Sequence, residues 1–199
     1  MTAIGVFAEA PLPGACLTGL LAAHAPEWVA GLYAAMLRDT LDGLLSITAD
    51  RYVVLAPDDD HAALARHAPA PWEIVTATGV GPALALLGPS TVLARSDAPT
   101  APVDPILEAI DAPLAIGAAT TGEAWVVVVN GVDLGDVSWR GPETAAALRL
   151  CARKLGVALV ELPTWPVVTE PSAVLDLLEE LRRHPERAPR TAHYVVTHG

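Results

Sequence analysis

Positive charge is scarce in this chain. Lysine and arginine together make up 12 of the 199 residues, against 23 aspartates and glutamates, and the formal net charge is −11. Lys154 is the single lysine, and no lysine or arginine precedes Arg38. Surfaces that follow a nucleic-acid backbone gather lysine and arginine on one face. We therefore expect no nucleic-acid partner.

Cysteine and long apolar runs are scarce as well. Cys16 and Cys151 are too few and too far apart for a disulfide framework or a metal knuckle, which is typical of a reduced cytoplasmic protein. The apolar N-terminal stretch contains Glu9, Pro11 and Pro13 where a signal peptide needs an unbroken apolar region. No run of about 18 uncharged apolar residues is present to span a membrane. We expect a cytoplasmic protein with no membrane partner.

Apolar residues are plentiful and periodic. At 199 residues and 52% hydrophobic, the chain is long enough for one well-buried domain over 1–199, with 184–199 as a C-terminal tail that is free to be flexible. The patterns predict strands at 4–8, 52–56, 72–76, 91–95, 114–118, 124–129 and 157–162, and an edge strand at 194–196. They predict helices at 26–44, 61–67, 103–110, 142–155 and 172–183, and a brief one after Gly81.

This order of elements predicts the fold class. Strands that alternate with helices indicate an α/β domain with a mostly parallel sheet and helices on both faces. The strands at 114–118 and 124–129 follow one another closely and have the character of a hairpin. Ligands of such sheets bind at the carboxyl ends of the strands. We expect the site among residues 11–19, 57–59 and 96–99.

The first of these segments looks like a nucleotide-binding loop without its cations. A short apolar strand runs into the turn Pro11-Leu12-Pro13-Gly14, and such turns present backbone N–H groups to a phosphate. Lysine or arginine usually completes the neutralisation, but the flanking charge here is Glu9. Cys16 follows the turn, and its apolar neighbours together with Glu9 are expected to keep the thiol protonated.

The chain resembles a bacterial family of glycosyltransferase-like proteins with the GT-A fold, the arsenosugar-biosynthesis glycosyltransferase type, and is distantly similar to molybdenum-cofactor nucleotidyltransferases. The resemblance covers most of the chain. Its motifs are Val6-Phe7-Ala8 with Ala10-Pro11 and Pro13-Gly14, the segment 32–41, Val54-Leu55-Ala56-Pro57-Asp58-Asp59, Ser96-Asp97-Ala98-Pro99, Trp139 and Leu162-Pro163-Thr164-Trp165. It implies a sheet that binds a nucleotide-sugar with a divalent metal, Mg²⁺ or Mn²⁺, held by carboxylates.

The chain departs from the family pattern where that chemistry needs its residues. The three basic positions of the family's first loop are Glu9, Leu17 and Gly19 here, and only Thr18 matches. A further family carboxylate is missing at 121–124, although Glu123 lies two residues on. Both leading aspartates of the closing motif are replaced, by Val167 and Thr169. We interpret these losses as the joint relaxation of metal and nucleotide binding.

Five residues remain candidates for the site. The resemblance implies that the donor contacts Pro11, Pro13, Gly14 and Thr18, and that Asp97 is the metal ligand. Two of these residues also have structural explanations that need no ligand. Thr18 suits a turn, and Asp97 caps a Ser-Asp-x-Pro turn well. Mg²⁺ needs only one or two carboxylates when phosphates and water complete its shell, so both a metal and no metal stay open. No residue is assigned as catalytic.

Two classes of function follow. The first is a glycosyltransferase-like pseudoenzyme, or a weakly active relative, whose metal-binding and phosphate-binding residues are largely lost. The alternatives are an active metal-dependent glycosyl- or nucleotidyltransferase that takes a nucleotide-sugar, and a non-catalytic binding or assembly scaffold, for which a homo-oligomer is left open. Trp125, Trp139 and Trp165 either line the cleft or belong to the core.

Overall fold

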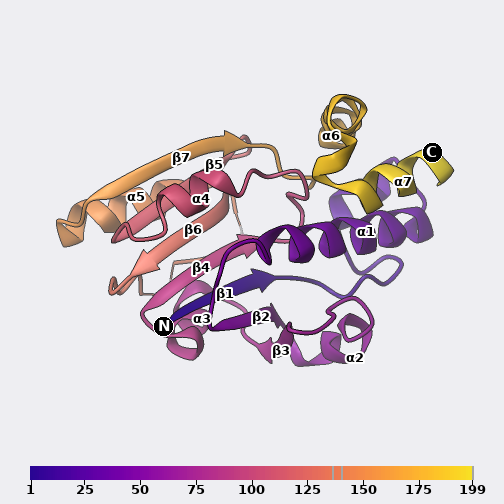
Figure 1. Ribbon diagram of the computed structural model, residues 1–199. Coiled ribbons are helices and arrows are strands. Elements are labelled where there is room, and N and C mark those ends of the chain that lie inside the picture. Colours follow the sequence, from indigo (N-terminus) through magenta and orange to yellow (C-terminus); the bar gives the residue numbers. More distant parts are fainter. Residues whose placement is uncertain (136, 140, 199) are drawn as a thin grey trace.

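The computed structural model describes residues 1–135, 137–139 and 141–198, and its centre is one seven-stranded sheet with helices on both faces (Figure 1). The spatial order is β3-β2-β1-β4-β6-β5-β7. The strands are β1 (Thr2–Phe7), β2 (Arg51–Ala56), β3 (Glu73–Thr76), β4 (Ser90–Arg95), β5 (Leu114–Ala119), β6 (Ala124–Asn130) and β7 (Leu159–Trp165). β6 runs antiparallel to β4 and β5, and the other pairs are parallel. The predicted fold class is confirmed.

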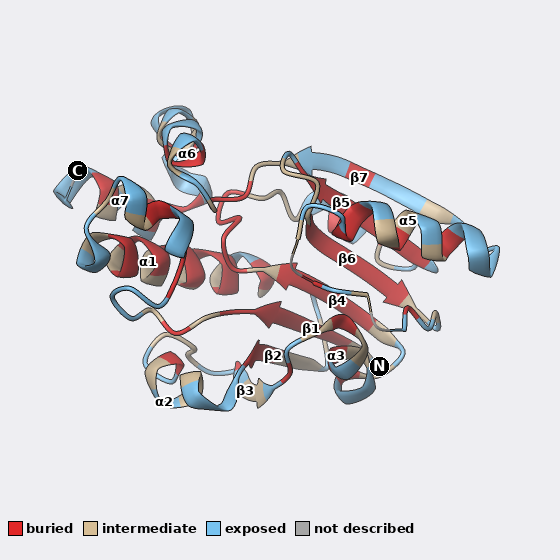
Figure 2. Cartoon of the chain, turned by 180° about the vertical axis from the view of Figure 1, so that it is seen from behind, coloured by how far each residue is buried: buried red, intermediate tan, exposed pale blue. Residues whose placement is uncertain are grey.

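The helices form two layers over this sheet. Their bounds are α1 (Pro26–Leu44), α2 (His61–Leu64), α3 (Val80–Leu87), α4 (Asp104–Glu108), α5 (Thr144–Leu155), α6 (Pro171–Arg183) and α7 (Pro189–His198), with short 3₁₀ turns η1 (Thr18–Ala22), η2 (Asp58–Asp60) and η3 (Pro185–Arg187). Apolar residues of α1, α2 and α4 pack on one face of the sheet, and those of α3 and α5 pack on the other. Figure 2 shows the central strands as the most buried part of the chain.

The long helix α1 follows from its sequence. Pro26 stands in the first turn, where its missing N–H costs nothing, and Glu27 complements the partial positive charge of the helix start. Its apolar residues recur three or four positions apart, and ten residues of the helix are buried. The predicted helix is confirmed. The N-terminal half of α1 packs with η1, α6 and α7 in a third apolar cluster, separate from the two that cover the sheet.

The predicted edge strand at 194–196 is wrong, because these residues lie in α7. Short apolar runs fit a strand or a helix equally well, and here tertiary contacts decide. Asp39, in the middle of α1, accepts hydrogen bonds from the backbone N–H of Thr191 (2.7 Å) and of Arg190 (3.2 Å) at the start of α7. Val195 is buried in a cluster with apolar residues of α1. The tail from 184 onward thus forms η3 and α7, and α7 lies alongside α1 (Figure 1).

The sheet reverses its direction of growth at β1. After β1 the chain builds β2 and β3 on one side and then crosses over to β4 on the other, so β1 and β4 pair directly while their following loops diverge. Open α/β sheets bind ligands beyond the carboxyl ends of strands at such a switch point. Glu9 and Asp97 lie at this edge, two residues beyond the ends of β1 and β4, respectively.

None of the helices in the described part of the chain is both long enough and apolar enough to cross a membrane.

Candidate functional site

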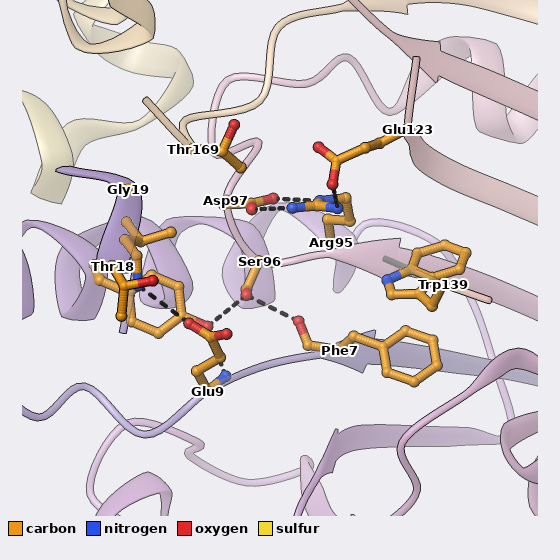
Figure 3. A pocket seen from close by; sticks show the side chains of 12 residues that line it. Phe7, Glu9, Thr18, Gly19, Arg95, Ser96, Asp97, Glu123, Trp139 and Thr169 are labelled. Carbon is orange, nitrogen blue, oxygen red and sulfur yellow. Dashed lines mark hydrogen bonds and ion pairs between the residues drawn. The ribbon is translucent and has the colours of Figure 1, made fainter. Parts of the chain in front are cut away.

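A cavity of about 260 Å³ opens at the switch point, beyond the ends of β1 and β4 (Figure 3). Residues from seven separate segments of the described chain meet there, which is typical of a site assembled by the fold rather than by one motif. The lining residues are Phe7, Glu9, Leu17, Thr18, Gly19, Tyr33, Arg95, Ser96, Asp97, Glu123, Trp139 and Thr169.

Arg95 lies between two carboxylates at this cavity. Its Nε donates to Asp97 Oδ1 at 2.7 Å, and a second hydrogen bond joins Nη2 to Oδ2 of the same carboxylate. On its other side Nη1 lies 3.0 Å from Glu123 Oε1, in an ion pair. The three side chains are only 8 to 14% exposed. Figure 3 shows the guanidinium between the two acids.

The fold brings these three charges together from two segments. Arg95 ends β4, and the chain turns directly after it at Ser96 and Asp97, which lets the Asp97 carboxylate reach the Arg95 guanidinium. Glu123 lies in the turn between β5 and β6, where the Ala119 N–H donates to its carbonyl at 2.7 Å. Thr121 Oγ1 donates to Glu123 Oε2 at 3.1 Å and orients the carboxylate.

Burial and charge act in opposite directions on Arg95. Desolvation alone would lower the pKa of the guanidinium, but the attraction and hydrogen bonds of Asp97, and then those of Glu123, outweigh it and raise the pKa well above the ordinary value. The guanidinium is therefore always charged. A fixed internal cation occupies the place between the two carboxylates.

A chain of hydrogen bonds ties the first loop to the end of β4. The backbone N–H of Glu9 donates to Tyr33 Oη at 2.8 Å, and Ser96 Oγ donates to the Phe7 carbonyl at 2.9 Å. Because the Ser96 proton is used in that bond, the contact of 2.7 Å between the two hydroxyls has Tyr33 as donor and Ser96 as acceptor. Burial is the main cause that raises the pKa of Tyr33, so the phenol stays protonated.

The carboxylate of Glu9 takes a backbone donor of the loop. Glu9 Oε2 accepts from the N–H of Leu17 at 3.1 Å, and Leu17 itself is in the left-handed region with φ of 42°. In a phosphate-binding loop such N–H groups point at the ligand. Burial, followed by the charge of Glu9, raises the pKa of Cys16 to about 11, so the prediction of a protonated thiol is confirmed.

Gly19 leaves no room for the cation that the family pattern has at its position. A Cβ atom there would lie 2.3 Å from the backbone carbonyl oxygen of Thr169. That distance is far below van der Waals contact, so no arginine fits without moving the chain. The loop before α6, which contains Thr169, thus fills the space that a basic side chain at position 19 would need.

The predicted site residues separate into two groups. Thr18 and Asp97 both line the cavity. Pro11, Pro13 and Gly14 lie in the same loop but outside the cavity lining, and Pro13 and Gly14 are exposed. Whether any of these five residues contacts a ligand stays a prediction.

Val167 and Thr169 stand where the closing motif of the family has aspartates, and their segment is held by contacts within the protein. Val167 is 1% exposed and packs in the core on the α1 side of the sheet. The neighbouring Val168 N–H donates to the Asp97 carbonyl at 2.9 Å, which fixes this loop against the end of β4. Thr169 lines the cavity.

A resident divalent metal fits these side chains poorly. Mg²⁺ and Mn²⁺ take oxygen ligands, and carboxylates are the usual protein donors. Both oxygens of Asp97 are engaged by Arg95, and the described residues include no group of three or more His, Cys, Asp or Glu placed to hold a metal ion. A divalent ion at Asp97 would also lie beside the positive charge of Arg95, which disfavours it.

The tryptophans have different places. Trp139 lines the cavity and packs against Phe7, with ring centroids 4.8 Å apart. Trp125 is 2% exposed and donates from Nε1 to the Pro163 carbonyl at 3.0 Å, so it belongs to the core. Trp165 donates to Thr100 Oγ1 at 3.2 Å, and Arg187 lies over its ring. Only Trp139 of these three faces the cavity.

Two members of this cluster, Arg95 and Glu123, are not among the residues that the sequence predicts for the site. Arg95 stands next to the Ser96-Asp97 motif, and its spacing of two from Asp97 at the end of a strand is a signal for an ion pair. Glu123 was noticed only as a carboxylate displaced from the family position. Its pairing with Arg95 spans two loops 28 residues apart and depends on the order of strands, which sequence patterns do not give.

The fold has close counterparts among solved structures. A protein from Desulfovibrio desulfuricans G20, provisionally assigned as a nucleotide-diphospho-sugar transferase, superposes with a TM-score of 0.84 at 20% identity over 98% of this chain and 94% of that one. A nucleotidyl transferase from Methanothermobacter thermautotrophicus gives 0.63 at 15% identity, over 92% and 98%. Glucosyl-3-phosphoglycerate synthase from Mycobacterium tuberculosis, in complex with Mn²⁺, UDP and glucosyl-3-phosphoglycerate, gives 0.50 at 15% identity, over 95% and 80%.

These similarities concern the backbone. No protein-family model matches the sequence, and no protein of curated function matches it. At identities of 20% and below, the shared feature is the arrangement of strands and helices. The chain therefore has the fold of the nucleotide-diphospho-sugar transferases.

Proposed function

We propose that this protein is a glycosyltransferase-like pseudoenzyme, weakly active at most, which binds a small molecule at the switch point of its sheet without a divalent metal. The observation that carries this proposal is the position of Arg95 between Asp97 and Glu123. A transferase of this kind needs a cation that offers open positions to the donor's phosphates. A guanidinium held by two protein carboxylates offers no such positions.

Two further contacts support the same conclusion. Glu9 Oε2 engages the N–H of Leu17, where a phosphate oxygen would otherwise accept. Thr169 closes the space at Gly19. In each of three places a contact within the protein stands where a ligand contact would be expected. These contacts are Glu9 with Leu17, Arg95 with Asp97, and Thr169 with Gly19.

An active metal-dependent glycosyl- or nucleotidyltransferase is the second candidate. It is favoured by the meeting of Thr18 and Asp97 at one cavity, at the edge of the sheet where such folds bind ligands. In that case Mg²⁺ or Mn²⁺ would displace Arg95 from Asp97 when a nucleotide-sugar binds. A non-catalytic assembly scaffold, a homo-oligomer and a cytoplasmic location stay predictions.

A thermal-shift titration separates the two candidates. The purified protein is heated with UDP-, GDP-, CDP- and dTDP-sugars, each with and without Mn²⁺, beside the variant Asp97→Asn. A ligand at a hundred times its Kd stabilises a folded protein by roughly 2.7 kcal/mol, which such a measurement resolves. We expect no metal-dependent shift in either protein. A shift that needs Mn²⁺ and disappears in Asp97→Asn would establish the active transferase instead.

A further inference from the structure

We propose that the cavity at the switch point binds a small primary amine that also carries a hydroxyl or carbonyl oxygen, such as an amino sugar or an amino alcohol. This inference rests on the proposed function, because a resident divalent metal would cancel the charge on which it depends. Three features of the cavity support it: its charge, an indole donor that has no partner among the described residues, and its size.

The charge of the lining favours a cationic ligand. Among the described lining residues, Asp97 and Glu123 together carry two negative charges against the one positive charge of Arg95. A phosphate that entered would meet these two carboxylates. An ammonium group brings three N–H donors to a site whose lining is rich in acceptor oxygens. Each carboxylate oxygen accepts more than one hydrogen bond, so Asp97 and Glu123 can receive a ligand while they hold Arg95.

The indole of Trp139 supplies the second, independent feature. Trp139 is 3% exposed, and its Nε1 has no hydrogen-bond partner among the described residues. Figure 3 shows that nitrogen on the side of the ring nearest Arg95 and Ser96. A buried donor without an acceptor is costly, and a ligand oxygen at this point would satisfy it.

Aromatic rings and volume narrow the ligand further. Phe7 and Trp139 pack together and form one wall, and an ammonium group near an aromatic face gains cation–π attraction. The volume of about 260 Å³ lies below the range of roughly 300–1,000 Å³ that buries a drug-sized ligand. A molecule of monosaccharide size fits, whereas a whole nucleotide-sugar would extend far beyond the cavity.

A series of sugars that differ only in charge tests the proposal. Glucosamine, glucose and glucose 6-phosphate are titrated into the full chain below neutral pH, where the amine is protonated, and binding is followed by protein-observed NMR. We expect glucosamine to bind at least about tenfold more tightly than glucose, which is a difference of about 1.4 kcal/mol, and glucose 6-phosphate to bind most weakly. The absence of glucosamine binding, or tightest binding of the phosphate, would overturn the proposal.

Three variants connect the binding to named side chains. Trp139→Phe keeps a ring but removes the donor, and should weaken both glucosamine and glucose by about threefold to tenfold. Glu123→Gln should remove most of the preference for glucosamine over glucose. Asp111→Asn, an exposed acid away from the cavity lining, is the matched control and should change nothing. Thermal unfolding of each variant checks that it is folded.

The outcomes also separate this inference from the proposed function. A metal-dependent response to nucleotide-sugars would refute the pseudoenzyme whatever glucosamine does. A protein that ignores both nucleotide-sugars and glucosamine would keep the proposed function and refute only the amine. Binding that the Trp139→Phe and Glu123→Gln variants leave unchanged would place the amine outside this cavity and refute the inference as well.

Discussion

Two buried aspartates of this protein are held in contrasting ways. Asp39, with a side chain 1% exposed, accepts from the N–H and the hydroxyl of Thr191, both at 2.7 Å, and from the N–H of Arg190. Asp97 is held by Arg95, which Glu123 approaches from the other side. The first group joins two helices away from the cavity, and the second lines the cavity at the switch point.

The difference lies in what each group leaves available. At Asp39 the backbone N–H groups of Arg190 and Thr191 and the Thr191 hydroxyl supply the donors, so the carboxylate serves as a cap for α7. At Asp97 one guanidinium serves two carboxylates, so negative charge and acceptor capacity remain beside an open cavity. A buried acid with a complete set of partners is structural, while a buried acid that shares its partner at a cavity is available to a ligand.

Removal of Arg95 should give the largest effect. Arg95→Met leaves Asp97 and Glu123 close together in a site that burial shields from water, and breaking a buried ion pair in this way costs about 3–5 kcal/mol of unfolding free energy. Denaturant unfolding of the wild type and of the variant measures this loss.

The matched control is Arg149→Met. Arg149 forms a hydrogen-bonded pair with Glu161 at 2.7 Å, but both side chains are partly exposed. Exposed pairs contribute about 0–1 kcal/mol. Equal losses in the two variants would contradict the view that the Arg95 cluster is a buried, charge-sharing site.

Removal of Asp39 should have the next largest effect. Asp39→Ala leaves the first N–H groups of α7 without their acceptor, and we expect a loss of about 2–3 kcal/mol in unfolding free energy. Hydrogen exchange should show α7 losing protection before the sheet does. Asp42→Asn, which alters only the partly exposed pair with Arg190, should cost less than about 1 kcal/mol. A rigid α7 in Asp39→Ala would refute the capping role.

A pair of glycine variants tests the closure of the loop over the missing cation. Gly19→Ala places a methyl group 2.3 Å from the Thr169 carbonyl oxygen and should cost about 1–3 kcal/mol, because backbone has to move. At Gly43, inside α1, a methyl group meets no atom within 4 Å, so Gly43→Ala should stabilise the protein by about 0.5–1 kcal/mol. Thermal unfolding of both variants gives the signs. A neutral Gly19→Ala would show that an arginine can return to this position.

The smallest effect concerns Cys16. Burial and Glu9 raise the pKa of its thiol from 9.0 to about 11, so the folded state holds a proton that the unfolded state has already lost at intermediate pH. The contribution of Cys16 to stability is therefore complete below about pH 9 and is lost as the pH rises from there toward 11. Cys16→Ala should flatten the fall in stability over that interval. An unchanged pH profile would contradict the raised pKa.

Much of the fold could be predicted because its signals are local. The helical spacing of α1 and the C′ glycine Gly156, which has φ of 65° and closes α5, each lie within one window of sequence. The hairpin of β5 and β6 joins two strands that are adjacent in the sequence. The alternation of strands and helices is simply the order of such local elements. The edge strand at 194–196 was wrong because its apolar residues suit either structure, and the deciding partner, Asp39, lies far away in the chain.

The site was less predictable for the same reason. The edge that holds it, with Thr18 and Asp97 at one cavity, followed from the fold class and the resemblance. Arg95, Glu123 and Trp139 can be recognised as site residues only from contacts between segments that are distant in the sequence. The closure at Gly19 depends on a backbone atom of Thr169, which no residue pattern encodes.

The most direct test of the central claim is a Mn²⁺ titration followed by electron paramagnetic resonance. Wild type and Arg95→Met are titrated side by side, with Arg95→Met/Asp97→Asn as the control for binding through Asp97. Wild type should leave Mn²⁺ free, Arg95→Met should bind it because Asp97 and Glu123 lose their internal cation, and the double variant should bind it more weakly. Stoichiometric Mn²⁺ binding by wild type, abolished by Asp97→Asn alone, would show instead that Asp97 is a metal ligand in the native protein.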